Sequence, residues 1–115
     1  ETIVGPELIS GSTRLKSGSA TKMVLNMIST VSMIKINRTY GNLMINMIPK
    51  NEKLKKRATK MISNKLNVSA ETAEFIFRKS GYNIKVAILM YKKSISYEQA
   101  LKLSESEIPF EELLK

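Results

Sequence analysis

The residues best suited to chemistry lie between Gly5 and Lys22, in the segment GPELISGSTRLKSGSATK. Within this segment, hydroxyl side chains, the cations Arg14 and Lys16, and small residues that leave backbone amides accessible lie close together: Gly11, Ser12, Thr13, Arg14, Lys16, Ser17, Gly18 and Ser19. A helix is predicted directly afterwards, and a helix N-terminus directs N–H groups and the positive end of its dipole toward an anion. The pattern is therefore typical of a phosphate site. The alternative is an ordinary polar loop in which Ser17 or Ser19 caps the helix.

The composition excludes several other kinds of active site. The sequence contains no Cys, His, Trp or Asp, which removes disulfides, zinc sites with Cys or His ligands, Ser-His-Asp triads and Cys-His nucleophiles. The segment also lacks the GxxxxGK[ST] spacing of a nucleotide-binding P-loop. A general acid or base in this chain would have to be Glu, Lys or Tyr.

The elements that position the segment are predicted from the spacing of apolar residues. Residues 1–18 are predicted to form a short extended entry and a polar loop. From residue 19 onward, apolar residues recur three and four apart, which predicts a helix with one apolar face: Ala20, Met23, Val24, Met27, Ile28, Val31 and Ile34. Leu25 and Met33 widen this face, so we expect the helix to need neighbours that this chain does not supply. Residues 37–50 break the periodicity and predict a connector.

The rest of the chain, residues 51–115, predicts a compact bundle of three or four short helices. Helix N-caps are expected where a short polar residue precedes an apolar run, at Asn51, Ser69, Asn83 and Ser96, the last with Gln99 at capping-box spacing. Gly81 is expected to end a helix. The stretch from Ile84 to Tyr91 is apolar on nearly all sides, which predicts the most buried helix. The sequence as a whole therefore predicts a mostly α chain.

Charge and hydropathy limit the partners. Nineteen Lys and Arg against ten acidic residues give a net charge of +9, and a cationic surface has some affinity for phosphate backbones. The densest basic run comprises Lys53, Lys55, Lys56, Arg57 and Lys60. On a helix we expect these side chains to spread around the solvated side, and no aromatic residues alternate with them to stack on bases. Nucleic-acid binding is therefore disfavoured at this level.

No membrane association is expected either. The longest apolar runs fall far short of the ~20 residues needed to cross a bilayer, and no secretory leader opens the sequence. We therefore expect a cytoplasmic protein.

The segment from Gly5 to Lys22 resembles the signature shared by the N-acetylmuramic acid 6-phosphate etherases and the glucokinase regulatory protein. The residues that match are Gly5, Pro6, Glu7, Gly11, Ser12, Thr13, Arg14, Leu15, Lys16, Ser17, Gly18, Ser19 and Lys22. The stretches 23–27, 40–44 and 51–54 resemble the etherase branch more loosely. The etherases are the nearer of the two groups, because the regulatory protein carries a second sugar-binding domain and is an animal protein.

The resemblance implies that this chain is the C-terminal portion of such an etherase. Residues 1–48 would then be the end of a sugar-isomerase-type α/β domain that binds the phosphosugar: a short strand, the polar loop and the long helix. Residues 49–115 would form a small bundle similar to ubiquitin-associated domains. The resemblance further implies a cytoplasmic homodimer, active in cell-wall recycling without a cofactor or a metal ion.

The reaction implied by the resemblance cleaves the ether that joins D-lactate to N-acetylmuramic acid 6-phosphate, giving N-acetylglucosamine 6-phosphate and D-lactate. The family's catalytic glutamates lie upstream, so no catalytic residue is expected here, and this chain alone is expected to be inactive. Lys16 is expected to contact the anionic substrate. Ser12 and Thr13 would be its hydroxyl partners, and Arg14 a second contact or a structural clamp. Glu7 belongs to the same site, where we expect it to fix the loop through backbone or Arg14 hydrogen bonds rather than to act as a base.

Two alternatives remain open. The chain could be a non-catalytic regulatory module of the same family, which would bind a phosphosugar without releasing lactate. It could instead be a helical domain that binds protein or nucleic acid through residues 51–115, with an affinity that depends strongly on salt.

Overall fold

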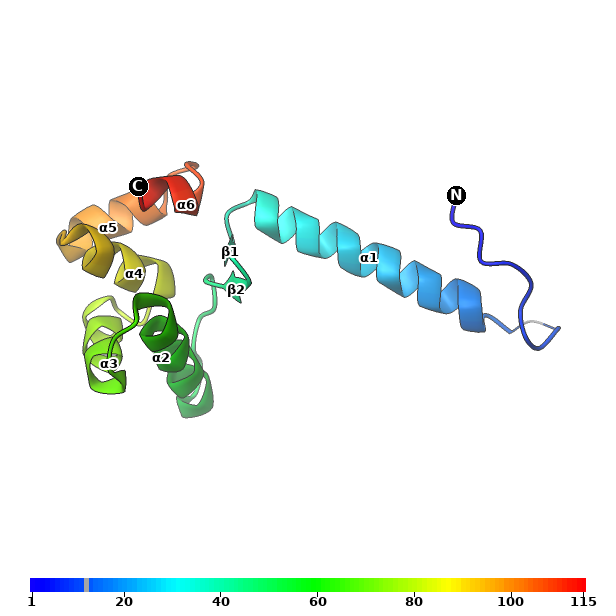
Figure 1. Ribbon diagram of the computed structural model, residues 1–115, viewed down its shortest axis with the longest axis horizontal. Helices are drawn as coiled ribbons and strands as arrows, with labels where there is room; N and C mark the ends of the chain where they lie inside the picture. Colours follow the sequence, from blue (N-terminus) through cyan, green and yellow to red (C-terminus); the bar gives the residue numbers. More distant parts are fainter. Residues whose placement is uncertain (12) are drawn as a thin grey trace. The chain divides into compact units, whose positions relative to one another are not determined.

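The computed structural model describes residues 1–11 and 13–115 and divides them into two compact units, Glu1–Ile36 and Asn37–Lys115. The first unit contains α1 (Leu15–Lys35). The second contains β1 (Thr39–Tyr40), β2 (Leu43–Met44), α2 (Glu52–Leu66), α3 (Ala70–Lys79), α4 (Ile84–Lys93), α5 (Tyr97–Ser104) and α6 (Phe110–Leu113) (Figure 1). The predicted mostly α class is confirmed.

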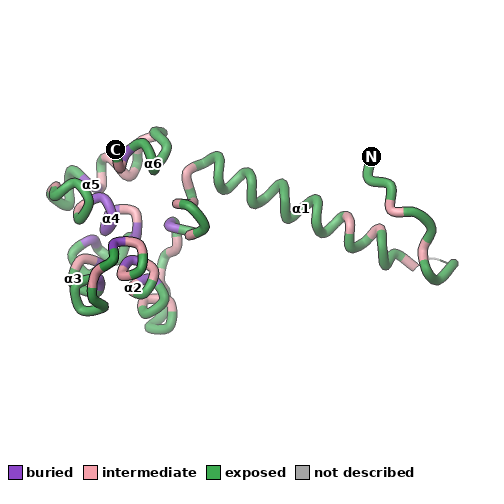
Figure 2. Tube along the Cα trace, in the orientation of Figure 1, coloured by how far each residue is buried: buried purple, intermediate pink, exposed green. Residues whose placement is uncertain are grey.

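Helix α1 begins earlier than its apolar pattern predicts and is exposed throughout. It starts at Leu15 rather than Ser19, so Ser17 and Gly18 lie within its first turn instead of in the loop, and neither Ser17 nor Ser19 caps it. No residue of α1 is buried, and Figure 2 shows it exposed along almost its whole length. Its exposed large apolar residues are Leu15, Met23, Val24, Leu25, Met27, Ile28, Val31, Met33 and Ile34. The neighbours that this helix needs are therefore absent from its own unit.

The helices of the second unit begin at the residues that the sequence predicts. The side-chain oxygens of Asn51, Ser69 and Asn83 each accept a hydrogen bond from the backbone N–H three residues later, at 2.9, 3.2 and 3.2 Å. Ser96 and Gln99 form a complete capping box at the start of α5. Each of these caps satisfies amides that the first turn of a helix leaves without an intrahelical partner.

Helix α4 is the centre of the bundle. Its buried residues are Ile84, Val86, Ala87, Ile88 and Leu89, and the helix packs against α2, α3 and α5. The turn that leads into it follows α3, where Gly81 adopts a φ of +64°, a conformation that glycine adopts without steric cost. The predicted stop at Gly81 and the predicted burial of this helix are both confirmed.

The predicted connector 37–50 contains a β-hairpin instead. Strands β1 and β2 pair antiparallel, with Tyr40 opposite Leu43, across a two-residue turn in which Gly41 has a φ of +56°. A Gly-Asn pair between short apolar stretches is a hairpin signal that the connector prediction overlooked. The Tyr40 ring meets the Phe110 ring edge to face, with centroids 5.3 Å apart, and Ile45 is buried in the core. Residues 37–48 thus pack with the bundle, and the chain divides into its two units between residues 36 and 37. The domain boundary that the resemblance implies lies between residues 48 and 49.

Replacing the buried residue of the hairpin should destabilise the second unit. Ile45 is 1% exposed, so Ile45→Ala leaves a cavity and should lower the free energy of unfolding by about 2–4 kcal/mol in urea denaturation. The matched control is the neighbouring residue Met44, which is 56% exposed. Met44→Ala should unfold like the unmodified chain, and equal losses in the two variants would contradict the packing described.

Candidate functional site

The Glu7 carboxylate caps helix α1 from outside the helix. Its Oε2 atom accepts a hydrogen bond from the backbone N–H of Lys16 at 2.9 Å, and its Oε1 atom accepts one from that of Ser17 at 3.1 Å. These two amides belong to the first turn of α1, where no intrahelical acceptor exists. The N-cap residue, Arg14, makes no side-chain capping hydrogen bond. The Glu7 carboxylate, nine residues upstream of Lys16, therefore accepts the kind of hydrogen bond that a local Ser or Asn accepts in α2 to α5.

Two more hydrogen bonds close the loop between Glu7 and α1. The Lys16 ammonium donates to the carbonyl oxygen of Pro6 at 2.9 Å, and the Thr13 hydroxyl donates to the carbonyl oxygen of Ile9. Gly11, with a φ of +100°, lies in the turn that brings the chain back toward the helix. These hydrogen bonds hold the loop at both ends. Lys16 contributes through both its backbone N–H and its side-chain ammonium group.

Electrostatics keep Glu7 in its charged form. The backbone N–H groups of Lys16 and Ser17 lower the pKa of the Glu7 carboxyl below its ordinary value, because they stabilise the carboxylate but not the neutral acid. The positive end of the α1 dipole acts in the same direction. At neutral pH Glu7 is therefore ionised with both oxygens engaged, an arrangement suited to holding the loop rather than to removing a proton.

The remaining predicted site residues lie close to this cap. Lys16 and Arg14 are exposed at the start of α1, and Thr13 is half-buried. Ser12 lies outside the described residues. The expectation that the helix N-terminus offers its amides to a phosphate is wrong for Lys16 and Ser17, because Glu7 already occupies them. An anionic ligand would have to be met by side chains.

A shallow cleft of about 270 Å³ lies farther along α1, against Thr2. Its walls are Thr2, Ser17, Ala20, Thr21, Val24 and Leu25. None of these side chains carries a charge, and the Thr21 hydroxyl already donates to the Ser17 carbonyl at 2.8 Å. This cleft therefore has no means of balancing the charge of a phosphate.

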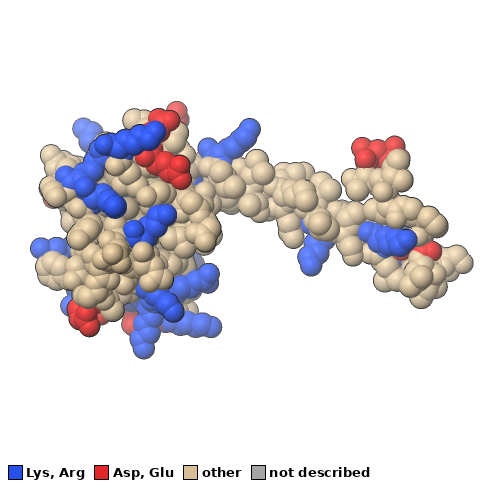
Figure 3. All heavy atoms as spheres, in the orientation of Figure 1, with Lys and Arg blue, Asp and Glu red and all other residues tan. Residues whose placement is uncertain are grey.

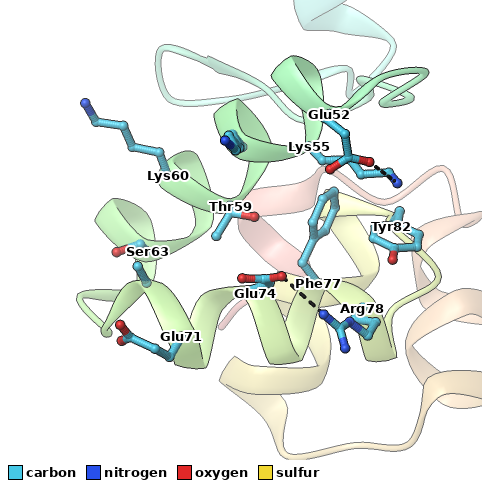
Figure 4. A pocket seen from close by; sticks show the side chains of 12 residues that line it. Glu52, Lys55, Thr59, Lys60, Ser63, Glu71, Glu74, Phe77, Arg78 and Tyr82 are labelled. Atoms are coloured by element: carbon cyan, nitrogen blue, oxygen red, sulfur yellow. Dashed lines mark hydrogen bonds and ion pairs between the residues drawn. The ribbon is translucent and has the colours of Figure 1, made fainter.

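A larger groove lies between α2 and α3, with a volume of about 620 Å³ (Figure 4). Three lysines line it from α2, two glutamates line it from α3, and Phe77 and Tyr82 complete it. Its ion pairs run along each helix and not across the groove: Glu52 with Lys55 at 2.8 Å and Glu74 with Arg78 at 3.2 Å. Sequence reasoning missed this groove, because its walls come together only when the two helices pack.

Two negative findings complete the description. Within residues 1–11 and 13–115, no cluster of three acidic side chains could hold a metal ion. None of the helices found there is both long enough and apolar enough to cross a membrane.

The cap predicts how Glu7 titrates. The hydrogen bonds that lower its pKa should stabilise the loop above the ordinary carboxyl pKa, and that stability should be lost as the pH falls through the lowered pKa. Carboxyl and amide NMR shifts should show Glu7 titrating below its ordinary value, with the amides of Lys16 and Ser17 following the same curve. Glu7→Gln should abolish the amide titration. An ordinary Glu7 pKa with unresponsive amides would refute the cap.

Comparison with known proteins shows what the chain is similar to. No family model matches it, but curated proteins named N-acetylmuramic acid 6-phosphate etherase do. The relative from Exiguobacterium sp. is 49% identical over 105 residues, which cover 91% of this chain and 36% of the relative. The relative from Pseudothermotoga lettingae is 43% identical and that from Bacillus subtilis 46% identical, each over 90% of this chain and 34% of the relative.

The chain thus spans about a third of the length of the curated relatives it matches. The aligned part is the C-terminal portion of each relative. The resemblance expected from the Gly5–Lys22 signature is confirmed by an alignment that runs through both structural units. The chain therefore corresponds to the C-terminal portion of the N-acetylmuramic acid 6-phosphate etherases.

Proposed function

We propose that this chain is the C-terminal part of an etherase that acts on N-acetylmuramic acid 6-phosphate in cell-wall recycling in the cytoplasm. The observation that carries the proposal is the similarity to proteins of that name, 41–49% identical over about nine-tenths of the chain. The loop before α1 agrees with it, because the loop is closed by its own hydrogen bonds and presents exposed cations.

The reaction proposed is an elimination followed by hydration. A base removes the proton from the carbon beside the sugar aldehyde, and the bond from carbon 3 to the lactyl oxygen breaks as an acid protonates that oxygen. Water then adds to the carbon–carbon double bond, which restores the sugar as N-acetylglucosamine 6-phosphate beside free D-lactate. The acid and the base are glutamates of the upstream region, so this chain alone does not turn over substrate.

Lys16 is the residue proposed to contact the substrate anion. Its ammonium group carries three donors, and the Pro6 carbonyl uses one of them, so two stay available for phosphate oxygens. Arg14 and Thr13 flank it at the start of α1, and Ser12 completes the proposed set. The role of Glu7 in this site is to hold Lys16 and Ser17 through their backbone amides.

The exposure of α1 supports its place in a larger domain. Following the resemblance, we assign residues 1–48 to the end of a sugar-isomerase-type α/β domain, of which residues 37–48 also pack with the bundle, and residues 49–115 to a bundle similar to ubiquitin-associated domains. A helix with nine exposed large apolar residues needs partners. The part of the relatives that this chain does not span, together with a second subunit in a homodimer, would supply them.

Lactate release tests the proposed activity. The longest product that the gene can encode should release D-lactate from N-acetylmuramic acid 6-phosphate, and this chain alone should release none. If neither protein releases lactate but this chain binds the phosphosugar in calorimetry, the regulatory-module alternative replaces the etherase proposal.

Substitution of Lys16 tests its assignment. In the longest gene product, Lys16→Ala should lower turnover by at least about tenfold, because the ammonium group would no longer stabilise the substrate anion. Lys35→Ala removes a lysine from the opposite end of the same helix and should leave turnover unchanged. Normal kinetics in the Lys16 variant would remove this residue from the site.

The exposed apolar surface of α1 should make this chain self-associate. Sedimentation velocity should show an average mass that rises with protein concentration, because association removes apolar area from water. Met27→Gln together with Ile28→Gln should weaken this association, whereas Met44→Gln, at an exposed position of β2, should not. A monomer at every concentration would show that the chain covers this surface itself.

A further inference from the structure

A row of four basic residues runs along the outer face of α2. Lys53, Lys56, Arg57 and Lys60, called the basic stripe below, are all exposed. At 100° per residue they fall within an arc of about 100°, on the side of α2 opposite the buried residues Ala58 and Ile62. Lys56 and Lys60 also line the groove between α2 and α3, and Figure 4 shows the end of the Lys60 side chain directed away from it. Four of the five members of the basic run thus lie on the solvated side of the helix, as expected; Lys55 is less exposed and pairs with Glu52.

The basic stripe does not serve the stability of α2. Like charges three or four residues apart on a helix repel one another. Lys53 also lies in the first turn, at the positive end of the helix dipole, where a cation is unfavourable. The ion pairs found in the described residues join Glu52 to Lys55 and Glu74 to Arg78, and neither includes a member of the stripe. The charge of the stripe is therefore left free to meet an anion outside the helix.

The unit that carries the stripe has a net positive charge. Residues 37–115 contain fifteen Lys and Arg and eight Glu, a net charge of +7. Four of those eight glutamates, Glu105, Glu107, Glu111 and Glu112, lie after α5 and in α6, whereas Glu52, Glu71 and Glu74 line the groove together with Lys56 and Lys60. Figure 3 shows the bundle carrying most of the basic side chains of the molecule, with several gathered on the side where α2 lies in Figure 1.

We infer that the basic stripe binds the phosphate backbone of nucleic acid without regard to base sequence. At a rise of 1.5 Å per residue the stripe extends about 10 Å from Lys53 to Lys60. Phosphates of one DNA strand rise about 3.4 Å per step along the duplex axis and also turn around it, so a straight stripe of this length can face at most about three successive phosphates. Because the stripe contains no aromatic residue, it cannot stack on bases, and only the charge interaction with phosphates remains.

The same surface is poorly suited to other polyanionic partners. Protein interfaces are depleted in lysine and rely on packed aromatic and apolar anchors, whereas three of the four stripe residues are lysines. A membrane surface would require exposed apolar side chains beside the cations. The large exposed apolar residues of residues 37–115 are Met44, Ile48, Phe75, Tyr82, Tyr91, Tyr97 and Ile108, none of which belongs to α2.

Fluorescence anisotropy with a short labelled duplex DNA of mixed sequence tests the inference, with the chain at full length. The logarithm of the association constant should fall with the logarithm of salt concentration with a slope of about −3. Replacing all four stripe residues by Gln should weaken binding by more than about tenfold and flatten that slope. A second duplex of unrelated sequence should bind equally well.

The matched control removes the same net charge elsewhere. Lys92, Lys93, Lys102 and Lys115 are exposed and lie outside α2. Replacing these four by Gln should leave most of the affinity. Equal losses in the two variants would mean that net charge alone attracts DNA, which overturns the stripe as a site. Equally tight binding of polyglutamate or of anionic lipid vesicles would overturn the assignment to nucleic acid. Circular dichroism of both variants excludes unfolding as the cause of a loss.

Discussion

The amides at helix N-termini, which have no acceptor within their own helix, are the constraint around which this structure is arranged. In the second unit each of the helices α2 to α5 meets the constraint locally, with an Asn or Ser at the N-cap. Helix α1 has no such residue and uses the Glu7 carboxylate instead. Because that acceptor lies far back in the chain, capping α1 also folds the loop that precedes it. The same pair of hydrogen bonds starts the helix, closes the loop and brings the Lys16 backbone into a defined place.

The hydrogen bonds of Glu7 also determine how the loop before α1 can bind an anion. A helix N-terminus with open amides would bind a phosphate through its backbone. Here a carboxylate already occupies that position, and its lowered pKa keeps it charged. Under the proposed function, recognition of a phosphosugar would fall to side chains, above all to the Lys16 ammonium group, which donates to the Pro6 carbonyl. In that proposal the glutamate would act on the ligand only by positioning its neighbours.

The two units differ more in how many apolar residues they bury than in their secondary structure. The second unit buries its apolar residues around α4 and draws Ile45 of the hairpin region into the same core. Helix α1 is longer than any helix of the bundle, yet it buries nothing. A helix so rich in exposed apolar residues has the composition of an internal element. This contrast agrees with a chain that matches only about a third of each relative.

The sequence by itself determined the features that depend on contacts between near neighbours. The caps at Asn51, Ser69, Asn83 and Ser96, the stop at Gly81 and the burial of α4 all follow from residue type and spacing within a few positions. The Gly5–Lys22 signature likewise led to the right family. Tertiary structure alone decided the cap of α1, because Glu7 and Lys16 meet only after the loop between them has turned. It also decided that Tyr40 of the hairpin packs against Phe110 and that α2 and α3 enclose a groove. Such contacts join residues far apart in the chain, and local propensity carries no information about which distant partner a side chain will meet.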